Sequence, residues 1–62
     1  MPMKVLEIVE GEHAGTLVPL DEFLEVNEGF KEDYPELSAL EIGDEFTDGG
    51  GAAPVWTVRR VA

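Results

Sequence analysis

The chain has 62 residues, 44% of them hydrophobic, and its 14 acidic residues outnumber four basic ones, which gives a formal net charge of −10. A chain of this length predicts one small acidic domain over residues 1–62. The charge argues against direct binding to nucleic acid and to anionic membrane surfaces, because phosphate groups repel it. Since Cys is absent, disulfides and thiolate zinc sites are excluded.

No targeting or membrane segment is predicted. Only two apolar residues separate Lys4 from Glu7, so residues 1–10 lack the apolar core of a signal peptide. No apolar run approaches the ~20 residues that span a bilayer, and we expect a cytoplasmic protein. A chain this short buries only about 60% of the surface that its unfolded state exposes. A partner protein or a homodimer is therefore an expected source of further stability.

The first twenty residues predict two strands. Residues 3–9 mix apolar and β-branched side chains with isolated charges, which is typical of a strand buried on much of both faces. Residues 10–15 contain two glycines and predict a turn. Residues 16–20 predict a short edge strand, because Pro19 cannot donate a hydrogen bond to a neighbouring strand.

The middle of the chain predicts one short helix over residues 21–28. Phe23 and Leu24 share one face of that helix, and two carboxylates lie in its first turn, where the helix dipole favours them. Residues 30–34 are expected to be irregular. Residues 35–39 begin with proline and predict a single helical turn.

The C-terminal third predicts two more strands, over residues 40–48 and 55–61, joined by a flexible connection at 49–54. The order of elements predicts an α+β fold, with a small antiparallel sheet of three to four strands and one short helix packed on it. The alternative is a small SH3-like barrel. The predicted core consists of Leu6, Ile8, Phe23, Leu24, Leu40, Ile42, Phe46, Trp56 and Val58.

The sequence offers no catalytic set, and we expect no enzyme, no cofactor and no metal. His13 and Ser38 are the only His and Ser, and nothing marks either as part of a nucleophilic device. His13, flanked by glycines, is expected in a solvated loop. Residues 44–55 resemble a calcium loop in part, but Phe46 and Val55 stand where that loop needs oxygen ligands.

Negative charge gathers in residues 20–48, which contain eleven of the 14 acids and only one basic residue, Lys31. If the predicted helix continued to Glu32, then Glu25, Glu28 and Glu32 would step along it by roughly 4.5–6 Å. That spacing is comparable to DNA phosphates, which advance about 3.4 Å along each strand. The candidate partner-binding residues are Glu22, Glu25, Glu28, Glu32, Asp33, Glu36, Asp44, Glu45 and Asp48.

In size, acidity and lack of Cys, the chain resembles small phage proteins of the anti-CRISPR and anti-restriction type that act as DNA mimics. The resemblance covers composition and charge and no residue motif. It implies a non-enzymatic inhibitor that occupies a basic, nucleic-acid-binding site on a partner protein. One alternative is a structural or regulatory module that binds a larger assembly through apolar and edge-strand contacts. Another is a solvated acidic face, although interspersed Lys and Glu would give solubility with less self-repulsion.

Trp56, Arg59 and Arg60 form a second candidate surface, because Trp and Arg are common interface anchors. A lone Trp in a small domain is more often part of the core. The two arginines can also neutralise acids on a neighbouring strand.

Overall fold

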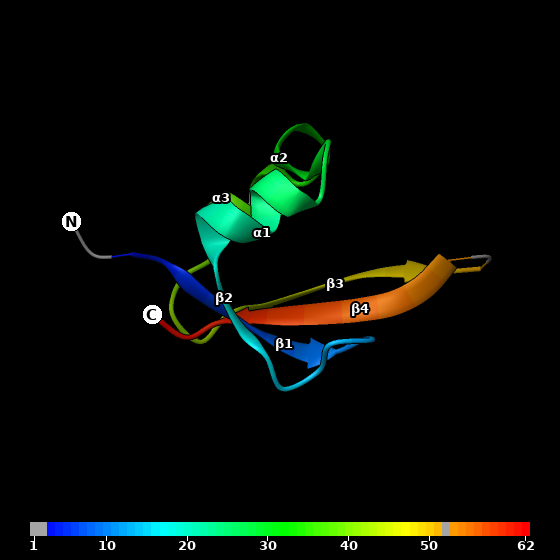
Figure 1. The fold of residues 1–62 in the computed structure, drawn as a ribbon, viewed down its shortest axis with the longest axis horizontal. Helices are drawn as coiled ribbons and strands as arrows, with labels where there is room; N and C mark the ends of the chain where they lie inside the picture. The colour runs from blue at the N-terminus through cyan, green and yellow to red at the C-terminus, as the bar shows by residue number, and fades with distance from the viewer. Residues whose placement is uncertain (1–2, 52) are drawn as a thin grey trace.

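The computed structural model describes residues 3–51 and 53–62. Within them, a four-stranded antiparallel sheet carries a layer of three short helices over one face (Figure 1). The strands are β1 (Val5–Glu10), β2 (Leu17–Pro19), β3 (Glu45–Gly50) and β4 (Ala53–Arg60), and the helices are α1 (Leu20–Val26), α2 (Phe30–Asp33) and α3 (Pro35–Ala39). The predicted α+β class is confirmed. The sheet is open, so the alternative barrel is wrong.

The strand order is β2-β1-β4-β3, which places β1 and β4 at the centre. Residues directly opposite each other in an antiparallel pair lie on the same face of the sheet. Ile8 and Phe46 both lie opposite Val58, and these side chains point toward the helices. Glu7 and Glu45 both lie opposite Arg59, on the open face.

The core lies between the sheet and the helical layer. Its buried side chains are Leu6, Leu20, Phe23, Leu37 and Val58. Trp56 is half-buried beside this core, where its ring centroid lies 5.4–6.1 Å from those of four other aromatic side chains, Phe23, Phe30, Tyr34 and Phe46. Offset and edge contacts of this kind stabilise aromatic clusters beyond the burial of their area. Trp56 therefore joins the helical layer to the sheet, as its interpretation as a core residue predicts.

The third predicted strand begins later than expected, and Ile42 is not in the core. β3 starts at Glu45, and the Ile42 side chain is 67% exposed. Residues 41–44 form a turn in which Asp44 Oδ2 accepts a hydrogen bond from the Glu41 N–H at 3.1 Å. The turn interrupts the alternation that would have brought Ile42 inward. Leu37, which was absent from the predicted core, is fully buried in its place.

The helical layer differs from the single helix predicted. α1 ends at Val26, because the backbone of Asn27 leaves the helical conformation, at φ −102° and ψ +81°. The side chain and backbone N–H of Asn27 both donate to the Phe23 carbonyl, at 2.8 and 3.2 Å. Gly29 then adopts a left-handed conformation, φ +89°, that glycine tolerates. The chain turns there into α2, in a segment predicted to be irregular.

The predicted helical turn at residues 35–39 is confirmed as α3. Along residues 3–51 and 53–62, no helix is long and apolar enough to cross a membrane. The connection between the last two strands is shorter than the one predicted at 49–54, because β3 extends through Gly50 and β4 begins at Ala53. Position 52 lies outside the described residues.

Candidate functional site

Six of the nine candidate binding residues lie on the helical layer and are exposed to solvent. We call them the acidic helical surface: Glu22, Glu25, Glu28, Glu32, Asp33 and Glu36. In the part of the chain that the structure describes, the only salt bridges are those of Arg59 with Glu7 and Glu45. The six carboxylates therefore carry negative charge that no ion pair within the described residues offsets.

The regular row of charges predicted along one helix does not form. Because α1 ends at Val26, Glu25 lies on α1, Glu28 lies in the connection and Glu32 lies on α2. The condition for a phosphate-like spacing, a helix continuing to residue 32, is not met. The acids instead spread over three short helices that cover one side of the sheet (Figure 1).

A hollow of about 340 Å³ lies among the three helices. Asp21 and Glu25 line it together with Leu24, Lys31 and Ser38. Carboxylates thus border a concave part of the helical layer, where a basic group of a partner can approach more than one of them. Lys31 is the only basic residue among the helices.

The other three candidates have partners within the molecule. Asp44 holds the turn before β3 through the Glu41 N–H. Glu45 lies on the open face, where its carboxylate accepts a hydrogen bond from Arg59 Nε at 2.9 Å. That hydrogen bond and the charge of Glu45 raise the pKa of Arg59. These contacts give Asp44 and Glu45 structural roles away from the acidic helical surface.

Asp48 lies opposite Trp56 in the sheet and is half-buried toward the helical layer. The polar influence of the Tyr34 hydroxyl, and after it that of the Gly49 backbone N–H, lowers the pKa of the Asp48 carboxyl. The same interaction raises the pKa of Tyr34. The sequence analysis did not single out Tyr34. Its residue type could have done so, because the hydroxyl of a tyrosine in a core region usually has a polar partner.

The four basic side chains divide between the sheet and the helical layer. Lys4 Nζ donates to the Ser38 carbonyl at 2.9 Å. Arg59 pairs with acids on both neighbouring strands, as predicted. Arg60 instead donates to the carbonyls of Leu40 and Ala62, at 2.9 and 3.0 Å. The two arginines are therefore engaged away from the acidic helical surface, whereas Lys4 reaches α3 and Lys31 lies on α2.

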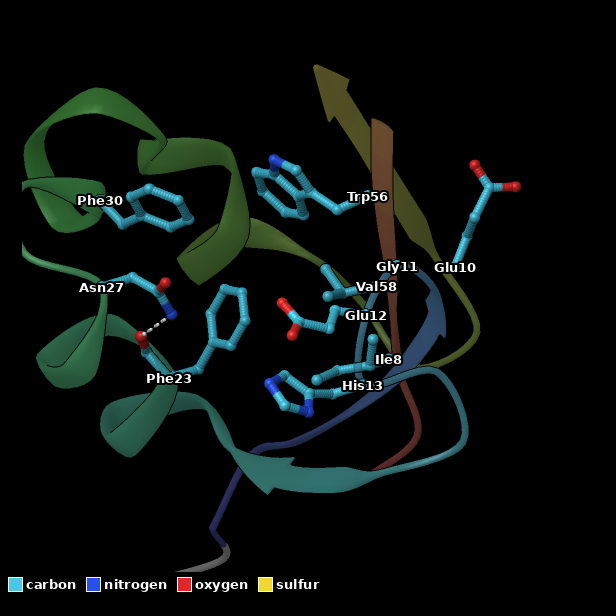
Figure 2. Close-up of a pocket in the computed structure, with 10 residues that line it drawn as sticks. All are labelled: Ile8, Glu10, Gly11, Glu12, His13, Phe23, Asn27, Phe30, Trp56 and Val58. Carbon is cyan, nitrogen blue, oxygen red and sulfur yellow. Dashed lines mark hydrogen bonds between the residues drawn. The ribbon is translucent and has the colours of Figure 1, made fainter. Parts of the chain in front are cut away.

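A second feature, which sequence reasoning missed, is an apolar pocket of about 150 Å³ at one end of the sheet. We call it the aromatic pocket; it is lined by Ile8, Phe23, Phe30, Trp56 and Val58, with Glu10, Gly11, Glu12, His13 and Asn27 around them. The side chains of Glu12 and His13 point from the β1–β2 turn toward Phe23, whereas Glu10 points away (Figure 2). No local pattern predicts this pocket, because its walls come from four separate segments of the chain.

In residues 3–51 and 53–62, no group of three or more His, Asp or Glu side chains is arranged to hold a metal ion. Comparison with protein-family models, with curated proteins and with solved structures finds no match to this chain. The acidic helical surface and the aromatic pocket are the two features of the described residues that bear on function.

Proposed function

We propose that this protein is a non-enzymatic, cytoplasmic inhibitor that binds a basic surface of a partner protein and occupies a site where that partner binds nucleic acid. The observation that carries the proposal is the separation of charge. Six exposed carboxylates on the helical layer have no ion pair within the described residues, while both arginines are engaged at the sheet or beside it.

This arrangement of like charges lowers the stability of the fold. Like charges three or four residues apart on a helix, such as Glu22 and Glu25 on α1, destabilise it by roughly 0.2–0.5 kcal/mol per pair. Solubility requires only mixed charges with a net charge of moderate size. A one-sided surface gains an advantage when it meets a basic partner, because electrostatic attraction raises the association rate and favours complementary surfaces.

The proposed recognition depends on charge density and not on a copy of phosphate spacing, since the acids belong to three short helices. The partner would carry Lys and Arg in a groove that also binds DNA or RNA. Binding by this protein and by nucleic acid would then be mutually exclusive. Both interactions would weaken as salt increases.

The test uses the immobilised protein and a fraction of heparin-binding proteins from a cell lysate. We expect the wild type to retain basic proteins at low salt and to release them when duplex DNA is added. The double variant Glu25→Lys/Glu28→Lys should lose this retention. The control Glu10→Lys/Glu41→Lys changes the net charge equally but lies outside the acidic helical surface, and should keep most of it.

Three outcomes contradict the proposal: no retention by the wild type, equal retention by the Glu25→Lys/Glu28→Lys variant, or retention that DNA does not reverse. Equal loss in both double variants would also contradict it, because net charge alone would then explain the binding. Circular dichroism of each variant checks that the fold is kept.

A structural or regulatory module remains the second candidate, favoured by the open face of the sheet. Leu17 and Val55 expose 62% and 42% of their surface there, and β3 is an edge strand. An edge strand can accept a further strand from a partner. Binding of this kind would persist at high salt and would weaken in Val55→Glu, whereas charge reversal at Glu25 and Glu28 would leave it unchanged.

A further inference from the structure

We propose that the aromatic pocket receives one long cationic side chain, an arginine or a lysine, from the partner protein. This inference rests on the proposed function, because it takes the partner's surface to be basic. It adds a specific anchor point to a contact that would otherwise depend on diffuse charge.

The inner part of the aromatic pocket suits an apolar stem. Ile8 and Val58 come from the two central strands, and Phe23 comes from α1. Trp56 and Ile8 are only half-buried, so apolar surface in the pocket remains in contact with water. The volume of about 150 Å³ is that of a cavity able to hold one benzene-sized group. The pocket therefore fits a single side chain and is too small for a cofactor.

The aromatic rings favour a cation over a neutral group. Phe30 and Trp56 stack with their centroids 5.4 Å apart, and Phe23 lies 5.9 Å from Phe30 and 6.1 Å from Trp56. The face of an aromatic ring carries partial negative charge and attracts ammonium and guanidinium groups. An alkyl stem ending in a cation can contact both the rings and the aliphatic side chains beside them.

Hydrogen-bond acceptors lie at the rim on two sides. The Glu12 carboxylate comes from the β1–β2 turn and points toward Phe23 across the pocket (Figure 2). The Asn27 amide nitrogen donates to the Phe23 carbonyl at 2.8 Å, which leaves the amide oxygen free to accept. A carboxylate and an amide oxygen attract a donor-rich cation and disfavour an anion.

The experiment titrates the protein with blocked amino acids and follows the fluorescence of Trp56, the only Trp in the chain. N-acetyl-arginine methylamide and N-acetyl-lysine methylamide should bind saturably. The norleucine derivative has an apolar stem without a charge and should bind about fivefold more weakly or worse, which is the loss expected for one cation–π contact. A citrulline derivative serves as the neutral counterpart of arginine.

The variant Glu12→Gln should weaken arginine binding by about fivefold, and its matched control is Glu41→Gln. Glu41 is also exposed but does not line the pocket, so its variant should bind like the wild type. Equal affinity for arginine and norleucine, or equal loss in Glu12→Gln and Glu41→Gln, would overturn the proposal. The pocket would then be an apolar site with no preference for cations.

The two proposals fail in different ways. The Glu25→Lys/Glu28→Lys variant should still bind arginine derivatives, because neither residue lines the pocket. Arginine binding in the pocket, together with no DNA-reversible retention of basic proteins, would overturn the proposed function alone. Retention that depends on Glu25 and Glu28, together with no preference for cations in the pocket, would overturn only the proposal that the pocket receives a cationic side chain.

Discussion

The Tyr34 hydroxyl and the Asp48 carboxyl shift each other's pKa, which pairs the helical layer with the edge strand β3. Tyr34 lies between α2 and α3, and its ring packs edge-on against Phe46 and Trp56 at centroid distances of 5.7 and 5.5 Å. The hydroxyl is thus held beside a carboxylate by aromatic packing around it. One acid of the negatively charged segment therefore stabilises the fold instead of facing solvent freely.

Replacing Tyr34 by Phe should remove the hydroxyl and keep the ring contacts. Since the Tyr34 hydroxyl is the main cause of the lowered pKa of Asp48, that pKa should rise toward its ordinary value of 3.8 in Tyr34→Phe. A carboxyl group with a lowered pKa in the folded state adds stability above its unfolded pKa and loses that contribution as pH falls through the folded value. A carboxyl-detected NMR titration of Asp48 measures the shift.

The same variant makes a prediction about stability. The wild type should exceed Tyr34→Phe in free energy of unfolding at pH 7. The difference should begin to shrink as pH falls below about 4, where Asp48 becomes protonated in the unfolded chain, and should vanish below the lowered pKa of Asp48 in the folded chain. Urea unfolding of both proteins at pH 7 and at a pH below about 4 measures this difference. A difference that stays constant with pH would show that the hydroxyl acts without the carboxylate.

Leu37 and Ile42 test the corrected core. Leu37→Ala should cost about 2–5 kcal/mol, because it opens a cavity at a fully buried site. Ile42→Ala, at a position 67% exposed, should change stability by no more than about 0.5 kcal/mol. A chain of this length has roughly 3–9 kcal/mol of stability in total, so the milder Leu37→Met provides a measurable folded variant. Urea unfolding followed by Trp56 fluorescence gives all three values.

Gly49 and Gly50 form a matched pair at the end of β3. Both have positive φ, +102° and +118°, so alanine strains the backbone at either position. A Cβ at Gly49 would also clash with the Pro54 carbonyl oxygen, whereas nothing lies within 4 Å of one at Gly50. Gly49→Ala should therefore be less stable than Gly50→Ala by about 1–3 kcal/mol. Equal stability in thermal unfolding would contradict this geometry.

Repulsion on the acidic helical surface predicts a dependence on salt. Glu25→Gln/Glu28→Gln should melt roughly 1–4 °C above the wild type at low ionic strength, because it relieves the repulsion between Glu25 and Glu22 on α1 and lowers the net negative charge of the helical layer. The gap should close in about 1 M salt, where the Debye length is near 3 Å. Glu45→Gln is the control: it also removes an acid but loses the Arg59 contact, so its melting temperature should not rise.

Some elements of the fold could be predicted from the sequence and others could not. The strand predicted at residues 55–61 and the helix predicted at 21–28 correspond to β4 and α1, because alternation and helical periodicity are local properties. Ile42 was placed wrongly because its pattern fits a strand, while the turn held by Asp44 interrupts that strand. The aromatic pocket was missed because Glu12, Asn27 and Trp56 are far apart in the chain.

The sequence by itself determined the α+β class, the absence of disulfides and the concentration of acids in the middle of the chain, since composition and periodicity are properties of neighbouring residues. Only the tertiary structure decided which acids have partners within the molecule and which do not. Glu45 is engaged because the register of β3 and β4 sets it opposite Arg59, and Asp48 is engaged because the helical layer brings Tyr34 over it. These pairings depend on contacts between distant segments, which no local pattern encodes.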